Sequence, residues 1–211
     1  MIIQNIIDKA EVNLMTPVCY EGKIHVAETP QDAERAVTYL RQFPMLGIDT
    51  ETRPSFRKGL RYQVSLLQVA TEQECFLLRL NLTGLTLPVI QLLESPHILK
   101  VGLSLKDDFA MLRARSPFQP QAYVELQEYA STFGIEEKSL QKIYALLFGQ
   151  KISKSKRLSN WDQPKLTLPQ QEYAAIDAWA CLKIYRKLEE LRATGDFVIE
   201  KREKKEKTDN E

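Results

Sequence analysis

The chain has 211 residues, enough for one sizeable α/β domain and too few for two large ones. Its 29 basic and 28 acidic residues leave a formal net charge of +1, so it lacks the strong overall basicity of many nucleic-acid-binding proteins. No apolar run approaches the ~20 residues of a membrane helix, and the N-terminus lacks the pattern of a secretory signal. We therefore expect neither a membrane span nor a secreted protein.

The three cysteines, Cys19, Cys75 and Cys181, are widely separated and form no C-x-x-C motif. An odd number in this arrangement argues against a disulfide framework and against a zinc site. The two histidines, His25 and His97, are interpreted as structural residues. These features indicate a reducing compartment, and we expect a cytoplasmic protein without zinc.

The N-terminal half predicts a helix and several strands. Residues 1–22 are expected to form a short helix or arm that leads into the domain. Residues 23–28 alternate apolar and polar side chains as a strand does, and Thr29-Pro30 then begins a helix that reaches about Phe43. Three further strands, expected to form an antiparallel meander, are predicted at 45–51, 64–70 and 74–78.

Helices and short strands alternate in the second half. Helices are predicted at 88–93, 105–115, 139–148 and 168–192, with a brief strand at 98–101 and a segment at 124–133 that ends before Gly134. Residues 150–168 are expected to form a basic loop, and the charged residues 201–211 a disordered tail. The order of elements predicts one domain over residues 23–200, an α/β fold with a mixed β-sheet flanked by helices.

Two carboxylates follow an apolar strand. Asp49 and Glu51 come directly after Met45–Ile48, and residues i and i+2 of a strand point to the same face. Like charges so close together repel each other, and burial makes each harder to ionise. Strands also end in ordinary acidic turns, so the pair alone does not establish a site.

A third carboxylate lies inside an apolar helix face. The residues that share this face with Asp177 are Tyr173, Ala174, Ala180, Cys181 and Ile184. Asp177 must therefore face the core, where a carboxylate needs a cation or a proton. A nearby Lys or Arg would also satisfy it.

The helix predicted at 105–115 adds a fourth carboxylate. Asp108 shares a face with Leu105 and Leu112, whereas Asp107 points elsewhere, but periodicity alone leaves the choice between the two close. Several inward carboxylates with few basic partners favour hard divalent cations, Mg²⁺ or Mn²⁺. Two such ions held by shared carboxylates are the usual device for phosphodiester hydrolysis.

Three motifs resemble those of the DEDD superfamily of 3′→5′ exonucleases, in its tyrosine-containing DEDDy branch. Asp-x-Glu corresponds to Asp49-Thr50-Glu51, Asp-x-x-x-Leu to 108–112 after Val101-Gly102, and Tyr-x-x-x-Asp to 173–177. The second motif's spacing selects Asp108 over Asp107. The sequence is most similar to the ribonuclease D-type and Werner-syndrome-type exonuclease domains.

Two connecting segments, 63–68 and Ser159-Asn160-Trp161, also resemble the Werner-type group, and the resemblance covers about residues 20 to 192. In one departure, Leu103-Ser104 stands where many relatives carry Asn or His before the second-motif aspartate. This departure bears on substrate details more than on the metal site.

The resemblance implies a ribonuclease H-like fold and a two-metal exonuclease that releases nucleoside 5′-monophosphates from a 3′ end. It implies that Asp49 bridges both ions, that Glu51 and Asp177 complete the first metal site, and that Asp108 holds the second ion. Tyr173 is expected to orient the attacking water. A metal-dependent endonuclease and a catalytically silent nucleic-acid-binding module remain as alternatives.

Contacts to DNA and/or RNA are expected from Thr50 beside the terminal 3′-hydroxyl and from two basic stretches near the motifs. The expected binding residues are Thr50, Arg53, Arg57, Lys58, Leu103, Lys154, Lys156, Arg157 and Trp161. Leu103 and Phe109 could wedge against terminal bases, although ordinary core packing is the preferred interpretation of both. Trp161 could stack on a base, and burial in the core explains it at least as well. The sequence leaves the preference between DNA and RNA and the oligomeric state open.

Overall fold

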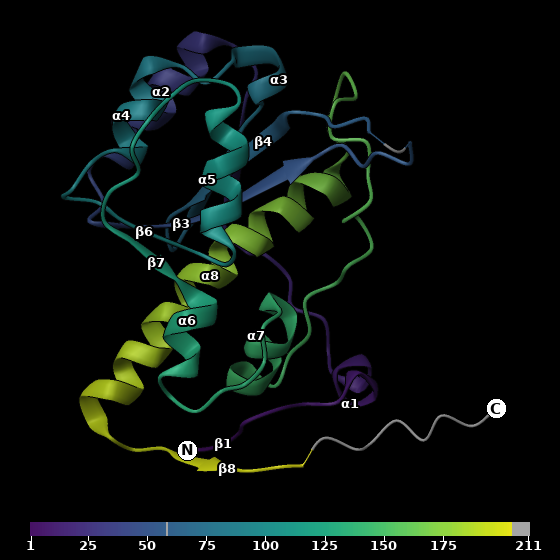
Figure 1. The fold of residues 1–211 in the computed structure, drawn as a ribbon, viewed down its shortest axis with the longest axis vertical. Helices are drawn as coiled ribbons and strands as arrows, with labels where there is room; N and C mark the ends of the chain where they lie inside the picture. Colours follow the sequence, from purple (N-terminus) through teal and green to yellow (C-terminus); the bar gives the residue numbers. More distant parts are fainter. Residues whose placement is uncertain (58, 204–211) are drawn as a thin grey trace.

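The computed structural model describes residues 1–57 and 59–203, and their centre is a six-stranded mixed sheet (Figure 1). In spatial order its strands are β2 (Lys23–Ala27), β5 (Glu74–Leu78), β4 (Val64–Ala70), β3 (Met45–Thr52), β6 (Leu99–Gly102) and β7 (Tyr123–Glu125). β3, β4 and β5 form an antiparallel meander, as predicted, and β2, β6 and β7 join it in parallel. The predicted mixed sheet is therefore confirmed.

Helices cover both faces of the sheet (Figure 1). One layer contains α2 (Pro30–Leu40), α3 (Leu80–Thr83), α4 (Leu87–Leu93) and α5 (Leu105–Arg113). The long α8 (Leu168–Thr194) crosses the other face, and α6 (Leu126–Ser131) and α7 (Leu140–Phe148) pack against it. The sequence did not predict α3. No helix of the described residues has both the length and the apolar character needed to cross a bilayer.

The helix ends follow from local hydrogen bonds. The Thr29 hydroxyl accepts the amide of Asp32, and the Asp32 carboxylate accepts the amide of Thr29, which confirms the predicted N-terminus of α2. Ser139 caps α7 as predicted, by accepting the amide of Lys142. Gly195 ends α8 in the left-handed conformation at φ 69°, where glycine is favoured.

The middle strand β4 is buried along its whole length because both of its faces are covered. Leu67 and Val69 join the core under α2 and α4, whereas Leu66 and Ala70 join the core under α8. A continuous apolar run can therefore form this strand, because the side chains on both of its faces are buried and neither face has to be polar.

A strand at the start of the chain pairs with a strand near the end of the described residues (Figure 1). β1 (Ile2–Gln4) lies parallel to β8 (Val198–Glu200), so the predicted N-terminal arm contains a strand as well as the helix α1 (Lys9–Leu14). Arg202, at the start of the predicted disordered tail, donates to the Glu11 carboxylate at 2.7 Å. Residues 204–211 of that tail lie outside the described residues.

Helix α8 approaches β3 more closely than side chains usually allow. A Cβ atom at Gly47 would lie 2.0 Å from the carbonyl oxygen of Ala178, so only glycine fits at this position. The neighbouring residues of α8, Ala174 and Ala175, are also small and fully buried. The helix backbone therefore rests almost directly on the strand that carries Asp49 and Glu51.

We expect Gly47→Ala to lower the free energy of unfolding by about 2–3 kcal/mol, because the added methyl group must push α8 away from β3. Urea unfolding followed by circular dichroism measures this loss. The control is Gly149→Ala, where a Cβ meets no atom within 4 Å but φ is 64°, so that only about 1 kcal/mol of backbone strain is expected. Equal losses in both variants would contradict the packing argument.

Candidate active site

Three carboxylates converge between β3 and α8. Asp49 and Glu51 share the face of β3 that also presents Gly47 to α8, and Asp177 lies on the facing side of that helix. One oxygen from each of the three lies within 4.8 Å of the other two. Glu51 is 8% exposed and Asp177 is 7% exposed, so the cluster is recessed.

Asp108 reaches the same region from the other layer of helices. β6 pairs with β3 only along Met45–Gly47, which leaves the edge of β3 beyond Gly47 open, and α5 begins beside this open edge. The Thr50 hydroxyl donates to the Asp108 carboxylate at 2.5 Å, whereas Asp107 is exposed. The structure therefore brings Asp108, and not Asp107, toward the cluster.

The turn into α5 is held by Glu125, a residue that the sequence analysis missed. Ser104 has a left-handed backbone, at φ 66°, and its amide donates to the buried Glu125 carboxylate at 2.8 Å. The Gln127 side-chain amide donates to the Ser104 hydroxyl at 3.2 Å. Glu125 thereby fixes the direction of α5 and the position of Asp108. A carboxylate at the end of a short strand was the available signal.

Crowding and burial raise the pKa values of the β3 carboxylates. Burial first, and then the charges of Asp177, Asp108 and Glu51, raise the pKa of Asp49 well above its ordinary value. Burial, followed by repulsion from Asp177 and Asp108, raises the pKa of Glu51 to about 9, while Arg157 acts in the opposite sense. Without a cation, the cluster therefore resists full ionisation at neutral pH.

The two helix carboxylates are also shifted. Burial raises the pKa of Asp108 to about 7, against the hydrogen bond from Thr50. Burial likewise raises the pKa of Asp177 to about 7, against a hydrogen bond from Tyr173 and the charge of Lys154. Tyr173, one turn before Asp177, thus contacts the cluster, and burial followed by the charges of Asp177 and Glu51 raises its own pKa.

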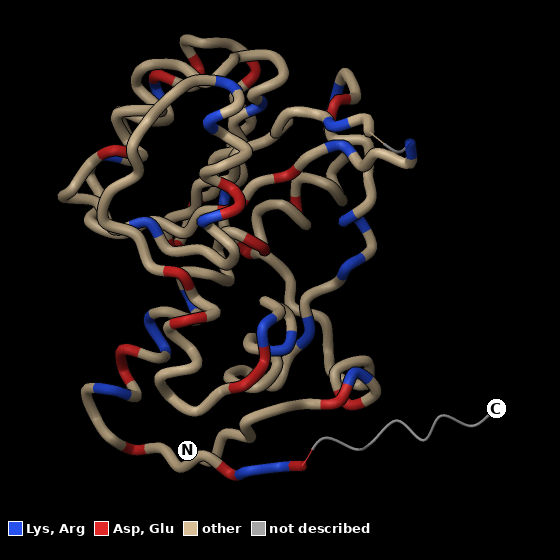
Figure 2. Tube along the Cα trace, in the orientation of Figure 1, with Lys and Arg blue, Asp and Glu red and all other residues tan. Residues whose placement is uncertain are grey.

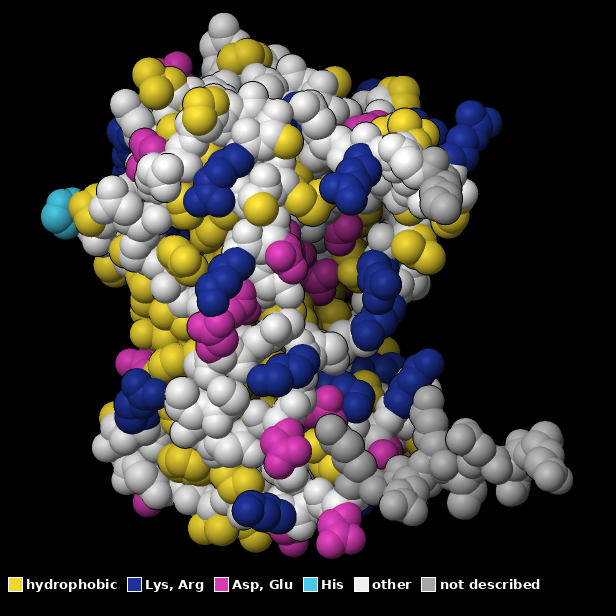
Figure 3. Space-filling model, viewed as in Figure 1, with side chains coloured by type: hydrophobic (Ala, Val, Ile, Leu, Met, Phe, Trp, Pro, Cys, Tyr) yellow, Lys and Arg dark blue, Asp and Glu magenta, His cyan; other side chains and the backbone are white. Residues whose placement is uncertain are grey.

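Basic residues lie along the loop between α7 and α8 (Figure 2). Lys154 and Arg157 are exposed but close enough to the cluster to lower the pKa values of Asp177 and Glu51, respectively. Lys156 is half-buried in the same loop. Figure 3 shows acidic side chains recessed in a hollow and basic side chains on either side of it.

The end of this loop is anchored by a fully buried arginine that the sequence analysis also missed. The Arg79 guanidinium, at the end of β5, donates to the carbonyl of Pro164 at 2.7 Å and to the carbonyl of Gln163. It also pairs with Glu28 at 3.0 Å. An apolar strand that ends in a single arginine was too weak a signal to identify this contact.

Several expected nucleic-acid contacts are not available. Trp161 is 0% exposed and its ring lies 6.1 Å from that of Tyr173, so base stacking by Trp161 is wrong and core packing explains it. Phe109 is 1% exposed, so it cannot wedge against a base either. Leu103 is half-buried against the core under α8.

The other expected contacts remain accessible or lie outside the structure. Arg53 and Arg57 are exposed after β3, and the Arg53 guanidinium lies over the Tyr62 ring at 4.8 Å. Thr50 is half-buried and bonded to Asp108. Lys58 lies outside the described residues.

Residues 24–192 match the profile of the 3′-5′ exonuclease family. This chain belongs to the 3′-5′ exonuclease family. It is 31% identical over 166 residues to the mouse bifunctional 3′-5′ exonuclease/ATP-dependent helicase WRN, and the match covers 75% of this chain and 12% of that protein. It is 28% identical over 174 residues to a 3′-5′ exonuclease of Arabidopsis thaliana, and this match covers 80% of the chain and 58% of the relative. The chain thus spans less than two thirds of the length of either relative.

Solved structures of exonucleases share the fold. Escherichia coli RNase D, an exoribonuclease involved in structured RNA processing, superimposes with a TM-score of 0.71 at 25% identity, over 82% of this chain and 46% of that one. The Aedes aegypti Nibbler EXO domain superimposes with a TM-score of 0.73 at 24% identity, over 86% and 94% of the two chains. The ribonuclease H-like fold and the resemblance to ribonuclease D-type exonucleases are therefore confirmed.

The carboxylate cluster of this exonuclease-family chain could hold a metal ion. Asp49, Glu51 and Asp177 supply oxygen donors, which hard divalent cations prefer, at a mutual spacing that one ion can bridge. None of the ion pairs formed by the described residues includes these three or Asp108. No described lysine or arginine is thus bonded to this negative charge, and a divalent cation fits the donor set.

A second hollow, of about 820 Å³, lies between residues 17–23, the β4–β5 turn and α8. Two of its carboxylates have partners: Glu72 pairs with Arg186, and Glu74 accepts from Tyr39 at 3.0 Å and bonds His25 at 2.6 Å. Its third carboxylate, Glu21, is exposed to solvent. The hollow therefore lacks the buried, uncompensated charge of the site at β3 and α8, and it does not compete as the active site.

We expect Asp177→Asn to stabilise the metal-free protein at pH 8 by about 1–3 kcal/mol, because it removes a buried charge from the cluster. Carboxylates with raised folded pKa values are stabilising below their unfolded values, near 4. That stability is lost as the pH rises through about 7 for Asp108 and Asp177 and about 9 for Glu51.

The stabilisation by Asp177→Asn should therefore shrink toward pH 5, as measured by urea unfolding in EDTA at both pH values. The control is Asp107→Asn on the exposed side of α5, which should be within about 0.5 kcal/mol of the parent at each pH. A destabilised Asp177→Asn variant at pH 8 would contradict the electrostatic account.

Proposed function

We propose that the chain is a 3′→5′ exonuclease that hydrolyses phosphodiester bonds of nucleic acid and releases nucleoside 5′-monophosphates. The observation that carries the proposal is the recessed cluster of Asp49, Glu51 and Asp177, with Asp108 beside it, in a chain of the 3′-5′ exonuclease family. Two divalent cations, Mg²⁺ or Mn²⁺, would lower the pKa of an attacking water and neutralise charge on the phosphate.

Each acidic side chain has a separate task in this proposal. Asp49 interacts electrostatically with all three other carboxylates, Asp177, Asp108 and Glu51, which suits a ligand that both ions would share. Glu51 and Asp177 would complete one metal site, and Asp108, held by Thr50, would contribute to the second. The raised pKa values of the metal-free cluster fall when a cation binds, because the cation favours the ionised carboxylates.

Tyr173 orients the attacking water. It hydrogen-bonds the Asp177 carboxylate, and its raised pKa keeps the phenol protonated at neutral pH, so its oxygen can still accept a hydrogen bond from the water. Trp161, packed against the Tyr173 ring, holds that ring in place.

The substrate is DNA and/or RNA with a free 3′ end. Lys154, Lys156 and Arg157 on one loop, and Arg53 and Arg57 on another, provide phosphate contacts on either side of the recess. One structural neighbour, Trypanosoma brucei RNase D, was solved in complex with RNA U12, with a TM-score of 0.70 at 19% identity over 80% of this chain and 63% of that one.

Two alternatives are weaker. An endonuclease needs carboxylates that an uninterrupted strand can approach, whereas Glu51 and Asp177 lie in a recess that favours a strand end. A catalytically silent binding module would not need all five site residues, and this chain has Asp49, Glu51, Asp108, Tyr173 and Asp177.

We propose residues 23–200 as the catalytic domain, preceded by the arm at 1–22. We also propose a cytoplasmic location, which suits the three free cysteines.

The catalytic proposal is tested on 5′-labelled single-stranded DNA and RNA with Mg²⁺ or Mn²⁺. We expect a ladder that shortens from the 3′ end, lowered at least about a hundredfold in rate by Asp49→Ala or Asp108→Asn and by a similar factor in kcat by Tyr173→Phe. The matched controls are Asp107→Asn and Tyr185→Phe, a tyrosine of α8 whose ring lies beside Tyr129, and both should retain activity. An undiminished rate in Asp49→Ala would refute the metal site, and internal cuts without a ladder would favour the endonuclease.

The phosphate contacts are tested by salt dependence. Replacing Lys154, Lys156 and Arg157 with alanine should weaken binding of a single strand and reduce the slope of log K against log salt by about 2, because three phosphate contacts are lost. Fluorescence anisotropy of a labelled oligonucleotide at several salt concentrations measures the slope. Alanine at Lys23, Arg35 and Arg41, on a different surface, is the charge-matched control. An unchanged slope in the first variant would show that its loop does not contact phosphate.

A further inference from the structure

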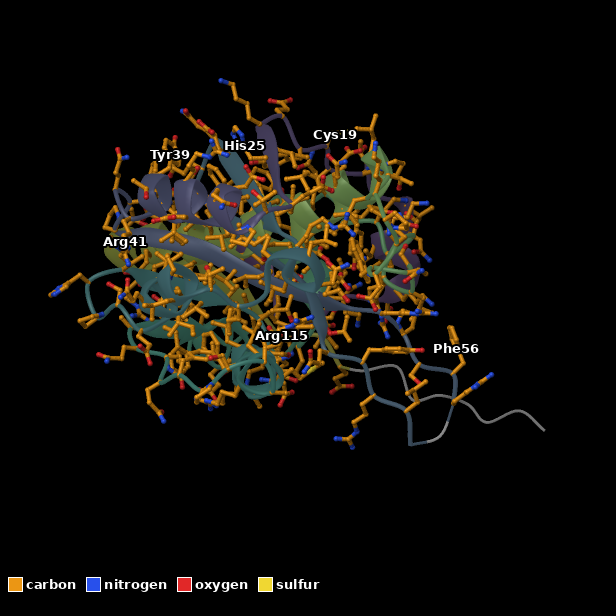
Figure 4. The ribbon with its side chains drawn as sticks, turned by 90° about the horizontal axis from the view of Figure 1, so that it is seen from above. Cys19, His25, Tyr39, Arg41, Phe56 and Arg115 are labelled. Atoms are coloured by element: carbon orange, nitrogen blue, oxygen red, sulfur yellow. The ribbon has the colours of Figure 1, made fainter. Side chains whose placement is uncertain are left out.

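The loop between β3 and β4 carries an unusual exposed aromatic residue. Phe56 is 85% exposed, and Leu60 in the same loop is 42% exposed. Figure 4 shows Phe56 on a loop that projects from the body of the molecule, well away from Arg41. No ring contact of Phe56 occurs within the described part of the chain, in contrast to Trp161, which packs against Tyr173.

All charged residues of the loop around Phe56 are basic. Between Arg53 and Arg61 the loop contains no acidic residue, and Arg53, Arg57 and Arg61 are all exposed. None of the three forms an ion pair with a described carboxylate. A lone exposed phenylalanine is common on protein surfaces, but one set among unpaired arginines fits a polyanion that also offers flat apolar faces.

The loop follows directly after β3, the strand that carries Asp49 and Glu51. Phe56 lies five positions after Glu51, and an extended chain spans at most about 3.6 Å per residue, so their Cα atoms are within about 18 Å. Stacked nucleotides advance about 3.4 Å each along a strand. Phe56 is therefore within reach of a base no more than about five nucleotides from a 3′ end held at the carboxylates.

We infer that Phe56 stacks on an unpaired base of a single-stranded substrate, a few nucleotides upstream of the 3′ end, while Arg53, Arg57 and Arg61 contact the flanking phosphates. This inference rests on the proposed function and adds a preference for single strands over duplex. An exposed aromatic ring can stack only on a base whose face is free, and in a duplex those faces are covered by neighbouring pairs. Glu51 and Asp177 are recessed, which also suits an unpaired end.

Binding is measured first, in the Asp49→Ala background so that no substrate is consumed. Phe56→Trp should show tryptophan fluorescence quenched by 12-nucleotide oligo(dT) or oligo(U), beyond the change seen in the parent, whose two tryptophans include the buried Trp161. Phe56→Ala and Phe56→Leu should weaken binding of the same oligonucleotides about five- to fiftyfold, and binding of a blunt duplex less than twofold. Leu14→Ala, at a residue 88% exposed on α1, is the matched control and should bind as the parent does.

Turnover is measured next, with Asp49 restored. The ratio of kcat/KM for a 12-mer to that for a dinucleotide should fall about five- to fiftyfold in Phe56→Ala, because a dinucleotide ends before the position at which Phe56 is inferred to stack. The inference would be overturned if Phe56→Ala bound oligonucleotides as tightly as the parent and Phe56→Trp showed no quenching. Equal losses of affinity for single strand and blunt duplex in Phe56→Ala would also overturn it. So would a loss of self-association in Phe56→Ala with its affinity for oligonucleotides intact. If the unmodified chain degrades no substrate while Phe56→Trp is still quenched, the proposed exonuclease activity fails and the stacking surface stands.

Discussion

The close approach of α8 to β3 is the constraint on which the site depends. Because Gly47 has no side chain, the carbonyl of Ala178 can lie where a Cβ would be, and Asp177 arrives beside Asp49 and Glu51. Any larger residue at position 47 would separate the helix from the sheet and spread the carboxylates apart. The glycine before the Asp-x-Glu motif and the alanines around Asp177 are therefore requirements of one geometry, in which a backbone packs against a backbone.

That geometry has an electrostatic cost that the rest of the fold must offset. Four carboxylates with raised pKa values oppose folding at neutral pH when no cation is present. The compensation lies in the fully buried β4, the two apolar cores on its faces, and Arg79, which anchors the loop before α8. The apolar scaffold keeps the site folded, and the crowded carboxylates lower the free energy of unfolding below what the scaffold alone would give.

Sequence patterns predicted the elements whose signals are local. The apolar run before Asp49, the cap at Thr29 and the apolar face around Asp177 each lie within one segment, and the structure has a strand or helix at each. The pairing of β1 with β8 and the role of Arg79 could not be predicted, because each depends on residues far apart in the chain. Trp161 shows a different limit: an aromatic residue in a basic loop fits a base or a core equally well, and only its burial decides between them.

The pairing of the two chain ends affects the order in which the molecule can be completed. The Gln4 side chain bonds Glu200, 196 positions later, so the partner of β1 leaves the ribosome only after every residue between the two strands has been synthesised. Contacts of such high sequence separation form slowly and late. During synthesis β1 therefore has no strand partner until β8 has been made, although its Ile3 belongs to a core cluster that also contains residues of α6, α7 and α8. The unpaired backbone groups of β1 are thus open to pairing with another chain until β8 covers them.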